Sequence, residues 1–228
     1  MDAPHEEGGA GFLFAFYKYS KLDAEHVGVV QRLVHALTAS DAIHVAVVPV
    51  HRCYAPAHAP ACVHPAALGM DCGAMRIEVG PTAYTAFIGW GFAEQPSEDI
   101  LTPEYDFIYL HVGCPETVNA GIRFLMGLRG ANYNYYMLPW TLLPRAWKGG
   151  HEKARRRNID GAHTAPTHKR AIFCSEMGLL LYYMCRGYSH PSLPPSECTP
   201  GELAQILLEE GGATPCDPRC ISVVTRCA

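Results

Sequence analysis

The sequence lacks the features that mark several common protein classes. The largely apolar run of residues 12–19 is far shorter than the roughly 20 residues that a membrane-spanning helix needs. The first residues are acidic and rich in glycine, whereas a secretory signal begins with positive charge. No P-loop, Gly-x-Gly-x-x-Gly, His-Glu-x-x-His or Gly-x-Ser-x-Gly motif occurs. The sequence therefore carries no local motif for nucleotide binding, zinc-dependent proteolysis or serine-based hydrolysis, and we expect no transmembrane segment.

Charged residues are also few, and positive charge is not in surplus. They make up 18% of the chain, with a net charge of −4, so we expect no general nucleic-acid partner. The basic run at 153–157 lies in a segment rich in His, Gly, Thr and Pro, which is typical of a solvated loop. The hydrophobic content of 49% is typical of a folded domain. A chain of this length buries roughly 70% of its surface on folding, so it needs no disulfide or metal for stability.

Cysteine is the residue present in unusual number, with ten in the chain. An even number of cysteines is compatible with a disulfide framework, but no secretory signal accompanies them. We therefore expect a reducing environment, either the cytoplasm or a virion. In such an environment we expect the cysteines to be mostly free and buried.

Hydrophobic periodicity predicts one domain of mixed α and β structure. The expected strands are residues 12–17, 42–50, 75–79, 83–92 and 106–112, and the expected helices are residues 23–38, 116–128, 175–187 and 199–210. Thr199 followed by Glu202 has the spacing of a helix capping box. We expect a single domain over residues 1–228, with a core at 12–208, inserted loops at 51–74 and 148–168, and a Cys-rich tail at 209–228.

Cys174 and His44 are the strongest candidates for chemistry. Cys174 stands at the start of a predicted helix, where free N–H groups and the helix dipole favour a thiolate and a nearby oxyanion. His44 is embedded in an apolar strand and is a candidate base for that thiol. Glu78 lies in the next predicted strand, where antiparallel pairing would let it orient the imidazole. A buried cysteine or histidine alone is more often a packing residue, so spacing leaves the structural and catalytic interpretations about equal.

A wider set of motifs favours the catalytic interpretation. Phe173-Cys174-Ser175-Glu176 and the apolar helix after it resemble the nucleophile motif of the circularly permuted NlpC-like (YiiX-like) cysteine hydrolases, a branch of the papain-like superfamily. Residues 42–48 resemble the His strand of that family, and residues 77–79 resemble its acidic strand. Residues 132–135 resemble the Tyr-containing segment before the Cys helix, and residues 196–203 resemble the closing segment. The resemblance spans residues 12–208, apart from the two inserted loops.

The resemblance implies an α+β, papain-like fold in which a central antiparallel sheet packs against the nucleophile-bearing helix. Cys174 would be the nucleophile, His44 the general base and Glu78 the orienting residue, with Tyr133 and Ser175 in the substrate-binding site. The implied reaction is acyl transfer without cofactor or metal, as in a thiol peptidase or amidase acting on a peptide, amide or acyl-linked substrate. We expect Glu176 to face solvent or to cap the first helical turn.

Three other interpretations stay open. Cys and His residues crowd segments 53–72 and 216–227, which favours a zinc-stabilised interaction protein, although no Cys-x-x-Cys pair occurs. A papain-like fold without activity would serve as a binding module. A lipid acyltransferase or esterase has a similar permuted order, but such families carry an Asn-Cys-Glu-His type of motif and a hydrophobic anchor helix that this chain lacks.

Overall fold

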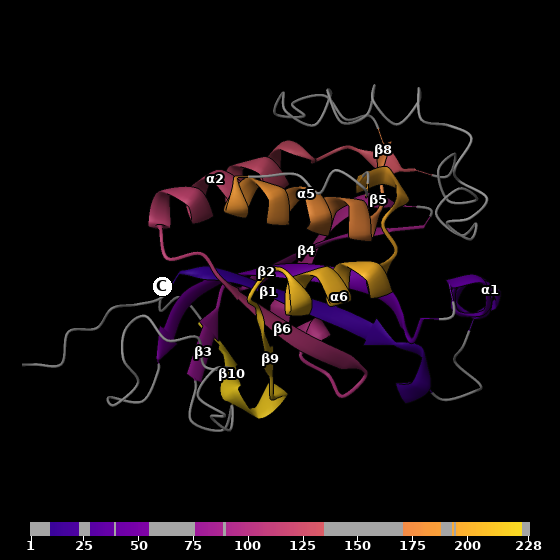
Figure 1. Cartoon of the computed structure of the whole chain (residues 1–228), viewed down its shortest axis with the longest axis horizontal. Helices are drawn as coiled ribbons and strands as arrows, with labels where there is room; N and C mark the ends of the chain where they lie inside the picture. The colour runs from indigo at the N-terminus through magenta and orange to yellow at the C-terminus, as the bar shows by residue number, and fades with distance from the viewer. Residues whose placement is uncertain are drawn as a thin grey trace, which may run out of the picture.

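The computed structural model of the chain describes residues 10–22, 28–38, 40–54, 76–88, 90–134, 171–187, 193 and 195–224. It has α+β architecture, in which helices pack against a large, mostly antiparallel sheet (Figure 1). The expected strands at 12–17, 42–50, 75–79 and 106–112 are confirmed within a few residues, as are the expected helices at 116–128, 175–187 and 199–210. Of the helix expected over 23–38, the structure describes the part from Val29 to Thr38.

The strands and helices are numbered along the chain. The strands are β1 (Gly11–Lys18), β2 (Ala42–Tyr54), β3 (Arg76–Val79), β4 (Thr82–Phe87), β5 (Gly91–Pro96), β6 (Tyr105–His111), β7 (Asn132–Tyr133), β8 (Ala171–Ile172), β9 (Thr214–Cys216) and β10 (Ile221–Val223). The α-helices are α1 (Val29–Thr38), α2 (Pro115–Gly127), α5 (Cys174–Arg186) and α6 (Pro200–Glu209). Short 3-10 helices are η1 (Tyr19–Lys21), η4 (Ser97–Ile100), η6 (Pro195–Glu197) and η7 (Pro218–Cys220).

Strand β1 is at the centre of the sheet and pairs antiparallel with β2 on one side and β6 on the other. It is buried on both faces, which is why its sequence is a continuous apolar run rather than an alternating one. The neighbouring strand β2 is 13 residues long. Its free edge carries two partners, β4 at Ala46 and Val47 and β3 from Val50 onward. One strand therefore links two separate parts of the sheet.

The two faces of β1 belong to two different cores. Phe12, Phe14 and Phe16 lie in a core shared with α2, α5 and α6. Figure 1 shows α2 and α5 running together along this face of the sheet, and the two helices are in contact. Gly121 of α2 permits this packing, because a Cβ there would lie 2.6 Å from the Phe12 ring and 2.8 Å from the Leu181 side chain.

The second core lies on the other face of β1, and its described buried members come from strands and from η4. They include Leu13, Val48, Ile77, Ile100, Phe107 and Tyr109. Among the described residues, no α-helix contributes to this core.

The segment expected to be a single strand at 83–92 is two strands joined by a turn, so that prediction is wrong. β4 and β5 pair antiparallel, with Phe87 opposite Gly91. Ile88 and Trp90 lie in the turn, and the Trp90 side chain is 83% exposed. Gly91 has φ +76° and packs so closely that a Cβ would lie 2.2 Å from the Ala131 carbonyl oxygen. The turn therefore depends on glycine, a signal that the alternation of apolar residues obscured.

The tail expected at 209–228 contributes strands to the sheet. β9 pairs antiparallel with β6, and β10 pairs parallel with β3, so the tail occupies both ends of the strand order. The six cysteines whose side chains the structure describes are free. The inserted loop at 148–168 lies outside the described residues, as does the loop at 51–74 beyond the end of β2. The division into a single domain with these boundaries stays a prediction.

Candidate active site

Cys174 is the first residue of α5 and follows Phe173, whose backbone is extended. The helix is apolar and almost wholly buried over its first ten residues, and it ends at Gly187, which adopts the left-handed conformation with φ 69°. The Cys174 side chain is only 4% exposed. The sequence thus places a buried thiol at a helix N-terminus, where the first N–H groups have no partner inside the helix.

His44 projects from the first half of β2 and is held by Thr85. Ala46 pairs with Thr85 across β2 and β4, which places Thr85 diagonally opposite His44 on the same face of the sheet. The Thr85 hydroxyl lies 2.7 Å from His44 Nε2 and donates to the Val45 carbonyl oxygen at 2.9 Å. A hydroxyl has one hydrogen, and Val45 receives it, so His44 Nε2–H must be the donor to Thr85. This arrangement leaves Nδ1 as the basic nitrogen.

Phe87 fixes the plane of the imidazole. Its ring stacks on His44 with centroids 5.0 Å apart and an interplanar angle of 17°. A hydrogen bond at Nε2 and a stacked ring on one face together restrict both torsions of the histidine side chain. Rigid placement of this kind is what a catalytic base requires.

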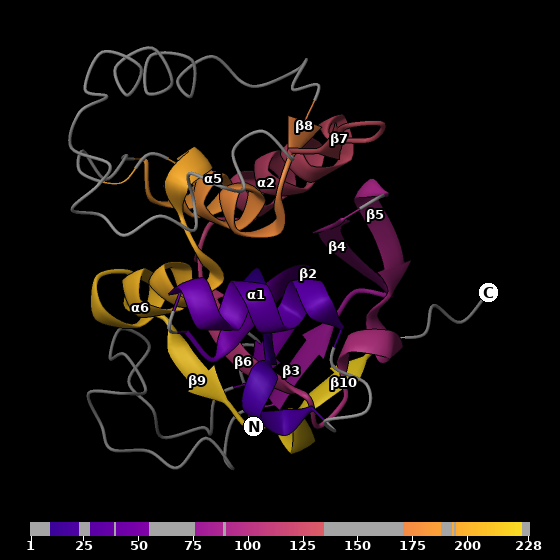
Figure 2. The same cartoon turned by 90° about the vertical axis from the view of Figure 1, so that its right-hand side faces the viewer.

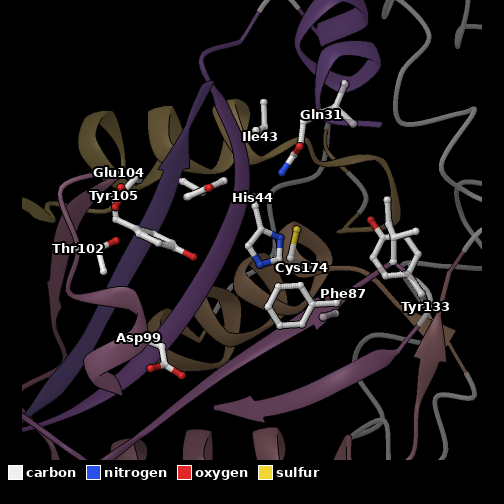
Figure 3. A pocket seen from close by; sticks show the side chains of 14 residues that line it. Gln31, Ile43, His44, Phe87, Asp99, Thr102, Glu104, Tyr105, Tyr133 and Cys174 are labelled. Carbon is white, nitrogen blue, oxygen red and sulfur yellow. The ribbon is translucent and has the colours of Figure 1, made fainter. Parts of the chain in front are cut away.

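In Figure 3 the Cys174 sulfur and the His44 ring both face the centre of the cavity. Both residues line the same cavity, and the backbone of Val45, the neighbour of His44, hydrogen-bonds to the Cys174 sulfur. Because Thr85 engages Nε2, the nitrogen left to accept a proton from the thiol is Nδ1. The fold therefore brings to one cavity two candidate residues that are 130 positions apart in the sequence.

Both groups are neutral at pH 7. Burial raises the pKa of the Cys174 thiol to about 11, although backbone hydrogen bonds from Val45, Ser175 and Cys174 itself act in the opposite direction. Burial also lowers the pKa of His44 to about 4. The resting site thus holds a thiol beside an unprotonated imidazole rather than a thiolate–imidazolium ion pair.

A cavity of about 500 Å³ opens onto these two side chains. Its lining comes from β1, α1, β2, β4, η4 and the segment after it, β6, β7 and α5. In Figure 2, α1 faces the viewer with α5 above it and the β4–β5 hairpin to its right, and all three contribute to the cavity. Tyr133 of β7 closes one side (Figure 3). This volume suits a small ligand or a few residues of a peptide.

Gln31 of α1 points its carboxamide into the cavity toward His44 and Cys174 (Figure 3). Its Oε1 accepts a hydrogen bond from the Gly28 backbone N–H at 2.5 Å. With the oxygen held in this way, the amide N–H groups are the part of the side chain that is available to a ligand. Sequence reasoning missed Gln31, because nothing in the pattern of a surface helix marks one polar residue as facing a cavity.

Three of the five expected site residues, Cys174, His44 and Tyr133, line one cavity. Glu78 does not join them. It pairs with Arg52, eight residues along β2 from His44, which corresponds to roughly 25 Å of strand. The expectation that Glu78 orients His44 is therefore contradicted by the strand register, and Thr85 occupies that place.

Ser175 is also a structural residue. Its buried hydroxyl donates to the Cys198 carbonyl oxygen at 2.6 Å, which ties the start of α5 to the segment before α6. The predicted role of Ser175 in substrate binding is thus not supported by its geometry. The sequence predicts that Glu176 faces solvent or caps the first helical turn; its side chain is 2% exposed, so it does not face solvent. The whole first turn of α5 is buried, so helix periodicity alone does not identify a solvent-facing side there.

In comparisons with known proteins, no family model, no curated protein and no solved structure matches this chain. None of the described helices is long and apolar enough to cross a membrane. Across the described residues, no group of three or more His, Cys, Asp or Glu side chains is arranged to hold a metal ion. Most of the predicted Cys and His cluster at 53–72 lies outside those residues.

Proposed function

We propose that this protein is a cysteine-dependent hydrolase of the peptidase or amidase type, with Cys174 as nucleophile and His44 as general base. One observation carries the proposal. A thiol at a helix N-terminus and an imidazole with a defined tautomer line the same cavity, although 130 positions separate them in the sequence. Packing alone does not require the hydrogen bond and the stacked ring that fix the histidine.

The reaction begins when His44 Nδ1 takes the Cys174 proton as the sulfur attacks the carbonyl carbon of the substrate. The carbonyl oxygen becomes an oxyanion, and the C–N or C–O bond then breaks as His44 returns the proton to the leaving group. A thioester remains on Cys174. Water attacks it with His44 again as base, which releases the acid and restores the thiol.

The oxyanion has two kinds of donor within reach of the site. Backbone N–H groups at the start of α5 already direct hydrogen bonds to the Cys174 sulfur. The Gln31 carboxamide faces the same point from α1, on the other side of the cavity. Pre-placed donors of this kind stabilise the charge that develops during attack, and losing one costs on the order of 10²-fold in rate.

A permuted papain-like arrangement is part of the proposal. The large antiparallel sheet, the histidine strand early in the chain and the cysteine helix later in the chain support it. The orienting residue differs from the one that the resemblance implies, since Thr85 replaces the carboxylate expected at Glu78. A neutral hydroxyl cannot raise the basicity of the imidazole as a carboxylate does. Thr85 therefore holds the His44 imidazole in position without raising its basicity.

The experiment is to trap the acyl-enzyme. The protein is mixed with p-nitrophenyl acetate near pH 8, and the acetylated cysteine is located by mass spectrometry after rapid quenching. We expect acetyl transfer to Cys174, absence of that product in Cys174→Ala, and a rate about 10²-fold lower in His44→Ala. Cys114→Ala serves as the matched control, because Cys114 is an exposed cysteine remote from the cavity lining. Acetylation of other cysteines with none at Cys174 would overturn the proposal.

The neutral state of the pair favours one alternative, a cavity that binds a ligand without chemistry. In that case His44→Ala would leave the acetylation rate of Cys174 unchanged. The rate of acetyl transfer would then depend only on ionisation of the buried thiol, and it would increase with pH up to the thiol pKa of about 11.

A further inference from the structure

One end of the cavity is formed by two tyrosines that face each other across neighbouring strands. Tyr17 of β1 pairs with Tyr105 of β6, and their rings are tilted by 48° with centroids 4.9 Å apart. Tyr105 is 9% exposed, and Figure 3 shows its hydroxyl pointing into the cavity toward His44. The described part of the chain gives this hydroxyl no hydrogen-bond partner. The hydroxyl of this largely buried side chain opens onto the cavity and is therefore available to a ligand.

The same end carries two carboxylates. Asp99 of η4 and Glu104, just before β6, both line the cavity (Figure 3). A hydrogen bond from the Thr102 side chain, with smaller contributions from backbone and from Lys21, lowers the pKa of Glu104. We call Tyr17, Asp99, Thr102, Glu104 and Tyr105 the acidic subsite.

Positive charge is missing from the walls of this space. No Lys or Arg is among the described residues that line the cavity, and neither Asp99 nor Glu104 forms an ion pair with a described residue. Lys21 lies near Glu104, but its ammonium group is paired with Asp106 at 2.6 Å and donates to the Tyr105 carbonyl oxygen at 3.1 Å. These two contacts hold the Lys21 ammonium group outside the cavity lining.

These features have one chemical preference in common. Carboxylates attract cations, and the electron-rich faces of tyrosine rings do so as well when a cation lies within about 6 Å. A cleft lined by charge of one sign concentrates ligands of the opposite sign. Within the acidic subsite, an anionic group would meet two negative charges and no positively charged side chain.

We infer that the acidic subsite binds a positively charged group of the substrate, an ammonium or guanidinium, while the carbonyl to be cleaved lies at Cys174. The substrate class is thus an amide or ester with a basic side chain or free amine near the scissile bond. This inference rests on the proposed function. Its distinctive element is the charge preference, which does not depend on turnover and can be measured separately.

The test compares three thiol reagents of similar size and different charge. They are aminoethyl methanethiosulfonate (cationic), sulfonatoethyl methanethiosulfonate (anionic) and methyl methanethiosulfonate (neutral). In each case the Cys174 sulfur attacks the sulfenyl sulfur, a mixed disulfide forms, methanesulfinate leaves, and the thiol proton passes to His44 or buffer. Rates at Cys174 are obtained by mass spectrometry of quenched samples, and each is divided by the rate of the same reagent with free cysteine.

We expect the cationic reagent to react with Cys174 about tenfold faster than the anionic one in low salt, after this normalisation. The preference should fall several-fold in Asp99→Asn/Glu104→Gln. Glu98→Gln is the matched control, because Glu98 is an exposed carboxylate on the same 3-10 helix that does not line the cavity. Added salt should weaken the preference in the native protein.

The outcomes separate the two proposals. Labelling of Cys174 with no charge preference, or with a preference that survives Asp99→Asn/Glu104→Gln, overturns the acidic subsite and leaves the hydrolase proposal standing. Failure of even the neutral reagent to label Cys174 shows that the cavity does not present a reactive thiol, which overturns both. A preference lost equally in Glu98→Gln reflects the surface potential of the protein and also overturns the subsite.

Discussion

Replacing Thr85 by valine isolates the group that holds His44 in place. The Thr85 hydroxyl bridges His44 Nε2 and the Val45 carbonyl oxygen, and the side chain is fully buried. Valine keeps the branched shape favoured in a strand but removes the bridge. His44 and the Val45 oxygen then lose a partner, and the imidazole is free to turn or to change tautomer.

The expected loss in the free energy of unfolding is about 2 kcal/mol. A buried polar group left without its hydrogen bond costs about 1–3 kcal/mol. The Val45 oxygen bears this cost in full, whereas water in the cavity compensates His44 in part. For a chain of this length the loss corresponds to a fall in melting temperature of about 4–8 °C. The rate of acetyl transfer to Cys174 should fall by at least ~10-fold, because the base no longer has one orientation.

Two further variants distinguish the hydrogen bond from packing. Thr85→Ser retains the hydroxyl and should recover most of the acetylation rate, with a residual stability loss of about 1 kcal/mol for the deleted methyl group. Thr82→Val changes a half-exposed threonine on the same strand and should leave both quantities near those of the native protein. Thermal melts and acetylation rates measured on all four proteins complete the comparison. If Thr85→Val reacts at the native rate, or Thr85→Ser is equally impaired, the hydroxyl does not position His44.

Three other predictions concern stability. Because burial lowers the pKa of His44 from 6.5 to about 4, the unfolded chain binds more protons than the folded chain between these pH values. Denaturant melts should therefore show the unfolding free energy falling by about 3 kcal/mol from pH 6.5 to 4, relative to His44→Gln, and parallel curves would contradict a buried neutral imidazole. Gly91→Ala should lower the free energy of unfolding by more than about 2 kcal/mol, because a Cβ there would collide with Ala131. Gly130→Ala should lower it by only about 1 kcal/mol, the cost of a positive φ, because a Cβ there meets no other atom of the described part of the chain. Equal melting temperatures of the two variants would refute this difference. Thr199→Ala should cost about 1 kcal/mol by removing the capping box of α6, and an unchanged melting temperature would show that the box contributes nothing.

Local signals in the sequence predicted much of the fold. The capping box at Thr199 and Glu202 is present as expected, and Gly187 ends α5 in the left-handed conformation. These signals involve residues only a few positions apart, so the surrounding structure does not alter them. The hairpin of β4 and β5 was missed because Ile88 and Trp90 continue an apolar alternation through a turn that depends on Gly91.

The candidate site was predicted in part. Cys174 and His44 carried their own signals, a thiol at a helix start and an imidazole in an apolar strand. The residue that contacts the His44 imidazole carried no such signal. Glu78 and Thr85 both lie in strands that pair with β2, so the sequence could not distinguish between them. A carboxylate is the more familiar partner for a histidine, and chemistry alone favoured the wrong residue.

The sequence by itself predicted most of the strands and helices, apart from the hairpin at 83–92 and the strands of the tail, and it marked Cys174 and His44 as candidates for nucleophile and base. It did so because backbone periodicity, caps and turn residues act over a few positions. Only the tertiary structure decided the register of β3 and β4 against β2, the burial of the whole first turn of α5, and which residues of α1, η4 and β6 share one cavity. These depend on contacts between segments far apart in the sequence, where the free energy of packing two cores against the sheet selects one register among several that satisfy the same local pattern.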